Sequence, residues 1–315
     1  MHTSARSMRF TELVGCRVPV QLAAMGGGVT TPELVTAVGR AGGLGMLQRG
    51  QAETFGRRVD EIVRAAAGPF GVNFVPALGH GGREEIELVS SRARLVEHFW
   101  AEPDPSLVAL VHAGGALAGW QVGSVEEARR AADAGCDLVV AQGVEAGGHV
   151  RGTTPLLELL ADVLQAVDVP VVAAGGIATA QAAQAAFAAG ADAVRVGTRF
   201  LATRESGAHP EYVEALLAAG PGDTVLTTAF GVGWPDAPHR VLASAVAAVA
   251  ALDGETVGEV AIGGERRPLP RFAARTPSRD VTGTIAAMPL YAGEGVGDVT
   301  EVVDAADVVR ELAGP

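Results

Sequence analysis

The chain has 315 residues, of which 48% are hydrophobic and 19% charged, so it can bury the core of one large α/β domain or of two ordinary ones. Its formal net charge of −12 argues against a nucleic-acid or anionic-membrane surface, because such surfaces need clustered basic residues. All 24 basic side chains are arginines, and a chain without lysine has no Schiff-base chemistry. Small molecules are therefore the expected partners, with no nucleic acid and no membrane.

The two cysteines and the long uncharged runs indicate the compartment. Cys16 and Cys136 form no CxxC pair, so reduced thiols are expected. The first residues lack the apolar core of a secretory signal. The uncharged runs 105–125 and 169–191 are interrupted by glycine or glutamine, which argues against membrane spans. We therefore predict a cytoplasmic protein.

Short runs rich in Val, Leu and Ala alternate with alanine-rich amphipathic stretches, a pattern typical of βα units around a parallel sheet. Helices are predicted between these runs, at 31–40, 52–67, 125–134 and 178–188 among others. The eight predicted strands are, in order, VPVQLAAM, LGMLQRG, FGVNFVP, SLVALVHA, LAGWQVGS, CDLVVAQG, VPVVAAGG and DAVRVGTRF. Eight such units predict the α/β class and a closed (β/α)8 TIM barrel. An open doubly wound sheet is the alternative, but the first glycine cluster, MGGGVTT, lacks the GxGxxG spacing of its dinucleotide fingerprint.

The pattern changes from about Arg204. HPEYVEALLAAG and PHRVLASAVAAVAAL are predicted helices, and ERRPLPRFAARTPSRD is a basic, proline-containing loop. The tail from Val299 to Leu312 is again a predicted helix and could close the barrel. We predict a barrel over 1–204, a small, mainly helical substrate or lid domain over 205–285, and a return to the barrel over 286–315.

Functional residues of a barrel gather at the carboxyl ends of its strands. The predicted strand ends are rich in amides and glycine and poor in carboxylates, which suits a polar, planar heterocycle better than a metal, and no metal site is predicted. His112 also follows a predicted strand and is a second-rank candidate. The principal strand-end residues are Met25, Gly26, Gln48, Asn73, Gln121, Gln142, Gly147, Gly148, His149, Gly175, Gly176, Gly197 and Thr198.

The seventh and eighth predicted strands end in Gly175-Gly176 and Gly197-Thr198, and loops at these two positions often bind phosphate in such barrels. Their backbone N–H groups could hold a terminal phosphate without a lysine, and Arg199 could add charge. For the Gly175-Gly176 corner alone, an ordinary tight turn is an equally good interpretation.

His149 follows a glycine pair after the sixth predicted strand. At the barrel mouth, an imidazole with a pKa near neutrality could remove a proton or stabilise an anion. The alternative is a hydrogen-bonded surface histidine without a catalytic role. Glu145 in the same loop is either a ligand for cofactor hydroxyls or a solvated loop charge.

These residues carry a resemblance to a known family. The strings AQGVEAGGHVRG, AAMGGGVTTPELVTAVGRAGGLGML, PFGVNF, VPVVAAGGIA and VRVGTRF, together with the later MPLYAGEGVGDV, resemble the nitronate monooxygenase family over nearly the whole chain. The resemblance implies an FMN-dependent barrel with a small substrate domain. It also implies an oxidoreductase, a monooxygenase that converts nitronates or nitroalkanes and O2 to carbonyl compounds and nitrite.

Position by position, the resemblance implies one catalytic residue, His149, as the base for a nitroalkane or the group that steadies a nitronate. It implies FMN contacts from Met25, Gly26, Asn73, Gln142, Gly147, Gly148, Gly175, Gly176, Gly197 and Thr198. Gln121 is added to the cofactor set, although relatives are expected to present a basic residue there. Predicted wall residues of the substrate pocket are Trp120, Phe230, Trp234 and Tyr291.

Two further functions remain open on the sequence. Flavin-dependent enoyl-ACP reductases and NAD(P)H:quinone reductases share the scaffold and carry similar loops, and they differ in their electron donor. A barrel that binds a phosphate ligand without catalysis is the other alternative. The sequence also leaves a homodimer open and does not identify the physiological nitro compound.

Overall fold

The computed structural model describes residues 5–314, with side chains from residue 8 onward. Eight parallel strands pair in the order β1-β9-β8-β6-β5-β4-β3-β2, and a parallel bridge between Gln21 and Leu44 joins the last strand to the first. The predicted (β/α)8 barrel is therefore confirmed. Its strands are β1 (Val20–Leu22), β2 (Gly45–Gln48), β3 (Phe70–Phe74), β4 (Leu95–His98), β5 (Leu117–Val122), β6 (Leu138–Gln142), β8 (Val171–Ala174) and β9 (Ala193–Val196).

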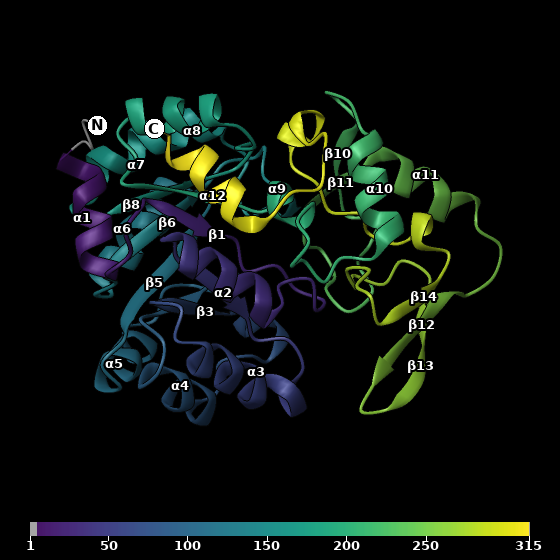
Figure 1. The fold of residues 1–315 in the computed structure, drawn as a ribbon, viewed down its shortest axis with the longest axis horizontal. Coiled ribbons are helices and arrows are strands. Elements are labelled where there is room, and N and C mark those ends of the chain that lie inside the picture. The colour runs from purple at the N-terminus through teal and green to yellow at the C-terminus, as the bar shows by residue number, and fades with distance from the viewer. Residues whose placement is uncertain (1–4, 315) are drawn as a thin grey trace.

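Helices follow the strands and surround the barrel (Figure 1). Their starts agree with the predicted ones because polar side chains cap them: the hydroxyls of Thr31, Ser124 and Thr179 each accept a backbone N–H of the first turn. None of the helices within residues 5–314 is long and apolar enough to cross a membrane. The helices of the ring are α2 (Pro32–Ala41), α3 (Ala52–Ala65), α4 (Arg83–Ser90), α5 (Pro105–Ala113), α6 (Val125–Asp133), α7 (Leu156–Ala166), α8 (Ala180–Ala188) and α12 (Ala305–Ala313).

One of the eight predicted strands is wrong. The run SLVALVHA belongs to helix α5, which Asp104 caps by accepting the N–H of Ser106, with Pro105 in the first turn. The fourth strand is instead β4, the short segment LVEH. His112 therefore lies in the last turn of α5, where its Nε2 is 2.8 Å from Asp137 Oδ2, and it is not at a strand end.

The barrel interior is apolar at its amino end. Helix α1 (Ala5–Val14) covers this end, and its Phe10 and Val14 pack in one cluster with Leu44, Met46 and other inward-facing residues of the strands. All four side chains are fully buried. Burial of this face fixes α1 under the barrel and leaves the carboxyl end of the strands as the open end.

The elements from Pro210 to Gly283 lie in a lobe beside the barrel, green in Figure 1. It holds two nine-residue helices but five strands, so the expected mainly helical insertion is wrong. The segment predicted as one helix from Pro238 begins as strand β11. The elements are α10 (Pro210–Ala218), β10 (Thr224–Thr227), β11 (His239–Leu242), α11 (Ala243–Ala251), β12 (Thr256–Ile262), β13 (Glu265–Pro270) and β14 (Val281–Gly283).

The lobe is joined to the barrel through a short strand of the loop after β6. This strand, β7 (Gly148–His149), pairs antiparallel with β11, so that His149 lies opposite His239 in the ladder. The lobe has its own buried cluster, which includes Tyr212 and Phe230. The remaining short helices are α9 (Thr198–Leu201) and the 3₁₀ helices η1 (Pro76–Leu78), η2 (Ile285–Ala287) and η3 (Glu294–Asp298).

Candidate functional site

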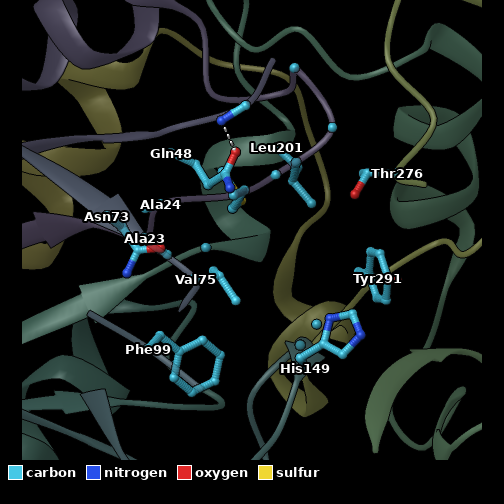
Figure 2. Close-up of a pocket in the computed structure, with 18 of the residues that line it drawn as sticks. Ala23, Ala24, Gln48, Asn73, Val75, Phe99, His149, Leu201, Thr276 and Tyr291 are labelled. Carbon is cyan, nitrogen blue, oxygen red and sulfur yellow. Dashed lines mark hydrogen bonds between the residues drawn. The ribbon is translucent and has the colours of Figure 1, made fainter. Parts of the chain in front are cut away.

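A cavity of about 820 Å³ opens at the carboxyl ends of the strands, between the barrel and the lobe. Its size is that of a site for a cofactor or a small ligand. Figure 2 shows its two walls, with Asn73 and Phe99 on the barrel side and Tyr291 beside His149 opposite them. The predicted residues that line it are Met25, Gly26, Asn73, Gln121, Gln142, Gly147, Gly148, His149, Gly175, Gly176, Gly197, Thr198, Trp234 and Tyr291.

Two of the predicted wall residues lie elsewhere. Trp120 is 1% exposed and donates its indole N–H to the carbonyl of Ala101, outside the strands. Consecutive strand residues point to opposite faces, so Gln121 can face the barrel interior only if Trp120 faces the helices. Phe230 is fully buried in the core of the lobe. Both residues are core, and their assignment to the substrate pocket is wrong.

Several glycines at the cavity are required by the fold itself. Gly175 has φ +127° and Gly176 has φ +67°, which favour glycine at both positions. A Cβ on Gly147 would lie 2.5 Å from the backbone nitrogen of Gly293. These glycines allow the loops after β6 and β8 and the segment around Gly293 to approach one another closely.

Gly26 and Gly197 are different, because the protein itself has room for a side chain there. Neither has a positive φ, and a Cβ on Gly197 would meet only Ala23 Cβ at 3.4 Å and Met25 Sδ at 3.6 Å. A Cβ on Gly26 would be 3.9 Å from the side chain of Gln48. Since these neighbours all line the cavity, a methyl group at either position would take up cavity space. The bare backbone there fits a ligand that lies directly against it.

A buried polar layer lies across the barrel beside the cavity. Arg195 of β9 forms an ion pair with Glu97 of β4 that uses both nitrogens and both oxygens at the ends of the two side chains. Arg195 also donates to Gln121 Oε1 at 2.7 Å and to Gln21 Oε1 at 3.2 Å. Asn73 Nδ2 donates to Glu97 Oε1 at 2.8 Å. Five strands thus contribute to one network whose charged members are less than 5% exposed.

His149 is held from both sides of its backbone. Its strand pairs with β11, and its carbonyl accepts a hydrogen bond from Gln142 Nε2 at 3.0 Å. Its ring stacks on Trp234 of the lobe and has Tyr291 at 5.6 Å between ring centroids. Its Nε2 is buried and has no hydrogen-bond partner. The imidazole therefore lines the cavity with the rest of its ring, whereas Nε2 itself is covered by neighbouring atoms.

Burial lowers the pKa of His149 to about 3, and the neighbouring His239 contributes to the decrease. The sequence-based expectation of a pKa near neutrality is therefore wrong. The contacts of His239 also fit a neutral imidazole. Its Nδ1 is 2.8 Å from the carbonyl of Ala237, and its Nε2 accepts the N–H of Phe230 at 3.2 Å. Burial lowers the pKa of His239 as well. His149 is a neutral imidazole at physiological pH.

Glu145 and Arg151 of the His149 loop and Arg199 of α9 have structural partners. Both oxygens of Glu145 accept the N–H of Leu156 at 3.0 Å, at the start of α7. Arg151 pairs with Glu127 and Glu102. Arg199 donates to the carbonyl of Glu301 and does not line the cavity. These protein contacts explain the positions of the three side chains, and none of them needs a cofactor as its partner.

Sequence reasoning missed three contributors. Glu97 lies in the strand that was not recognised. Arg195 lies within the predicted strand DAVRVGTRF, where the alternation of inward and outward residues could have placed it in the interior. Trp100, directly after β4, has φ +61° and lies edge-on to both His149 and Trp234.

Basic residues also line the cavity. Arg57, Arg275 and His80 line it together with the acidic Glu33 and Asp280. Arg275 Nη2 is 3.4 Å from Asp280 Oδ2, but its Nε is buried without a hydrogen-bond partner. Such nitrogen donors can bind an oxyanion.

Comparison with known proteins gives one family and several relatives. A family model described as nitronate monooxygenase matches residues 7–83 and 77–314. Nitronate monooxygenase of Pseudomonas aeruginosa is 34% identical over 292 residues, which covers 76% of this chain and 82% of that protein. A (3aS,4S,5R,7aS)-5-hydroxy-7a-methyl-1-oxo-octahydro-1H-indene-4-carboxyl-CoA dehydrogenase of Rhodococcus jostii is 37% identical over 235 residues, 74% of this chain. The match spans 64% of that dehydrogenase, less than two thirds of its length.

Two solved structures share the whole architecture. Nitroalkane oxidase from Streptomyces ansochromogenes has a TM-score of 0.77 and 31% identity, over 97% of this chain and 96% of that one. FabK from Thermotoga maritima has a TM-score of 0.80 and 27% identity, over 96% and 94%. The similarity therefore covers the barrel and the lobe together.

Proposed function

Because the chain belongs to the nitronate monooxygenase family, we propose that it is an FMN-dependent enzyme of the cytoplasm that oxidises nitronates and nitroalkanes with O2 to carbonyl compounds and nitrite. The observation that carries the proposal is the imidazole of His149 in the wall of a cavity whose backbone is bare at Gly26 and Gly197. The two features supply a group that can accept a proton and a surface against which a flavin can lie.

The residues present fit FMN. Backbone N–H groups of the Gly175-Gly176 and Gly197-Thr198 corners would hold the phosphate, as at other glycine-rich anion sites. The amides of Asn73, Gln121 and Gln142 would meet the polar edge of the ring, and Met25, Gly26, Gly147 and Gly148 would lie along its length. When bound, FMN supplies the electron acceptor, and the protein supplies position and electrostatics.

His149 would act on the substrate as a neutral imidazole. Because burial lowers its pKa to about 3, the ring is neutral at working pH, and its unprotonated nitrogen would accept the α-proton of a nitroalkane. The imidazolium so formed would lie beside the nitronate anion, and that attraction offsets the burial cost of the charge. Trp234 and Tyr291 would cover the apolar part of a small substrate.

The decisive experiment is anaerobic reduction of the purified protein with two donors. The protein should be yellow, its visible flavin absorbance should bleach with a preformed nitronate, and NADH or NADPH should leave that absorbance unchanged. Bleaching by NADH or NADPH and not by the nitronate would show that the protein is a reductase and not an oxidase. A colourless protein that does not take up added FMN would overturn both functions.

A second candidate function is a flavin-dependent reductase or dehydrogenase of a thioester such as an acyl-CoA, or an NAD(P)H:quinone reductase. The similarity to a CoA-ester dehydrogenase and to FabK favours it, and so do Arg57 and Arg275 in the lining of the cavity, which could meet phosphate groups. Arg57→Ala should weaken binding of NADPH or of CoA thioesters if this function holds. Under the oxidase, the same substitution should leave nitronate kinetics unchanged.

A further inference from the structure

The ion pair between Arg195 and Glu97 has a chemical consequence for the two amides bonded to it. A carboxylate can only accept hydrogen bonds and a guanidinium can only donate them. Asn73 therefore turns its Nδ2 toward Glu97, and Gln121 turns its Oε1 toward Arg195. Both amides line the cavity, so Asn73 is left to present Oδ1, an acceptor, and Gln121 to present Nε2, a donor. The pair thus fixes which way each amide faces.

The pair also places charge asymmetrically. Arg195 lines the cavity, whereas Glu97 does not and is fully buried behind it. The cavity therefore has a guanidinium in its wall, although Gln121 stands where a basic residue was expected. This positive charge is supplied by a residue of β9 and not by a residue of β5. Its effect on a bound group is reduced by Glu97, because the two charges are in direct contact.

We infer that the Arg195–Glu97 pair orients the Asn73 and Gln121 amides toward the flavin ring. The charges of the pair also set how readily the flavin ring accepts electrons. The inference rests on the proposed flavin site. In this arrangement the Arg195 guanidinium stabilises the negative charge that the flavin ring acquires on reduction, and the Glu97 carboxylate partly cancels this stabilisation.

The test is the midpoint potential of the bound FMN in variants of opposite charge. Glu97→Gln removes the negative charge that opposes Arg195, so the midpoint potential should become more positive. The expected shift is at least about 30 mV, which for a two-electron couple is a tenfold change in the reduction equilibrium constant. Gln121→Glu adds a carboxylate at the cavity that can still accept from Arg195, so the potential should become more negative. Asp60→Asn is the matched control, because it changes net charge by the same amount at an exposed pair with Arg92, away from the cavity.

Opposite shifts in the two variants, with none in Asp60→Asn, would support the inference, since a purely structural role predicts no difference of sign. Absence of a shift in the variants that hold FMN, or shifts in one direction, would overturn it. If Glu97→Gln does not fold, the sign of the Gln121→Glu shift decides. A protein that holds FMN but is not reduced by a nitronate would refute the oxidase and leave this test intact, whereas a protein that holds no FMN would refute both.

Discussion

The imidazole of His149 lies parallel to the indole of Trp234, with ring centroids 3.8 Å apart and an angle of 19° between the planes. One ring comes from the loop after β6 of the barrel and the other from the lobe. The lobe therefore supplies part of the environment that makes this histidine neutral, in addition to the backbone pairing of β7 with β11. Changes in the lobe are expected to alter the proton affinity of His149.

Trp234→Ala should raise the pKa of His149 from about 3 toward its ordinary value, because burial is the main cause of the low value and the indole covers one face of the ring. Trp234→Phe is the control and should retain most of the effect. NMR titration of the imidazole protons, assigned with a His149→Asn variant, measures the change. An unchanged pKa of His149 in Trp234→Ala would show that residues other than Trp234 keep the imidazole buried.

His149→Ala should reduce kcat/KM for neutral nitroalkanes by about 10²–10⁴-fold and affect preformed nitronates much less, because only the former need a proton removed. Steady-state rates of nitrite formation with both forms of one nitroalkane give the comparison. His112→Ala, at the exposed end of α5, should leave both rates unchanged. Equal losses for the two substrates would contradict the role as base.

Much of the site could be predicted because glycine pairs and amides stand directly after apolar runs, and the carboxyl ends of parallel strands meet at one end of a barrel. The failures have physical causes. Glu97 and His98 make β4 look polar, since their burial depends on Arg195 and Trp120, which are distant in sequence. Apolar composition alone does not distinguish a strand from helix α5. The low pKa of His149 depends on residues of the lobe that the local motif does not contain.

Gly197→Ala should weaken FMN binding by tenfold or more without loss of folding. The backbone φ of −117° is not in the left-handed region and the new methyl group would contact only cavity residues, so the FMN-free protein should fold with a stability within about 1 kcal/mol of the wild type. The control is Gly115→Ala, where φ is +91° and the space is open. It should cost roughly 1–2 kcal/mol of stability and leave FMN affinity unchanged. Fluorescence titration and urea unfolding measure the two effects, and normal FMN affinity in Gly197→Ala would mean that the ligand does not lie against this glycine.

The protein should lose stability between about pH 6.5 and pH 4, partly through His98. Burial lowers the pKa of this histidine to about 4, and the ring stacks on Trp120 with 4.9 Å between centroids. In that pH range the unfolded chain binds the proton and the folded protein does not, so the free energy of unfolding falls as the pH is lowered, by up to about 1.4 kcal/mol per pH unit for each such group. His98→Phe keeps a ring against Trp120 and cannot titrate, so its unfolding free energy should depend less on pH. Urea unfolding at pH 4.5, 5.5 and 7, about the range set by the two pKa values, makes the comparison, and parallel curves for His98→Phe and the wild type would rule out His98 as a source of acid lability.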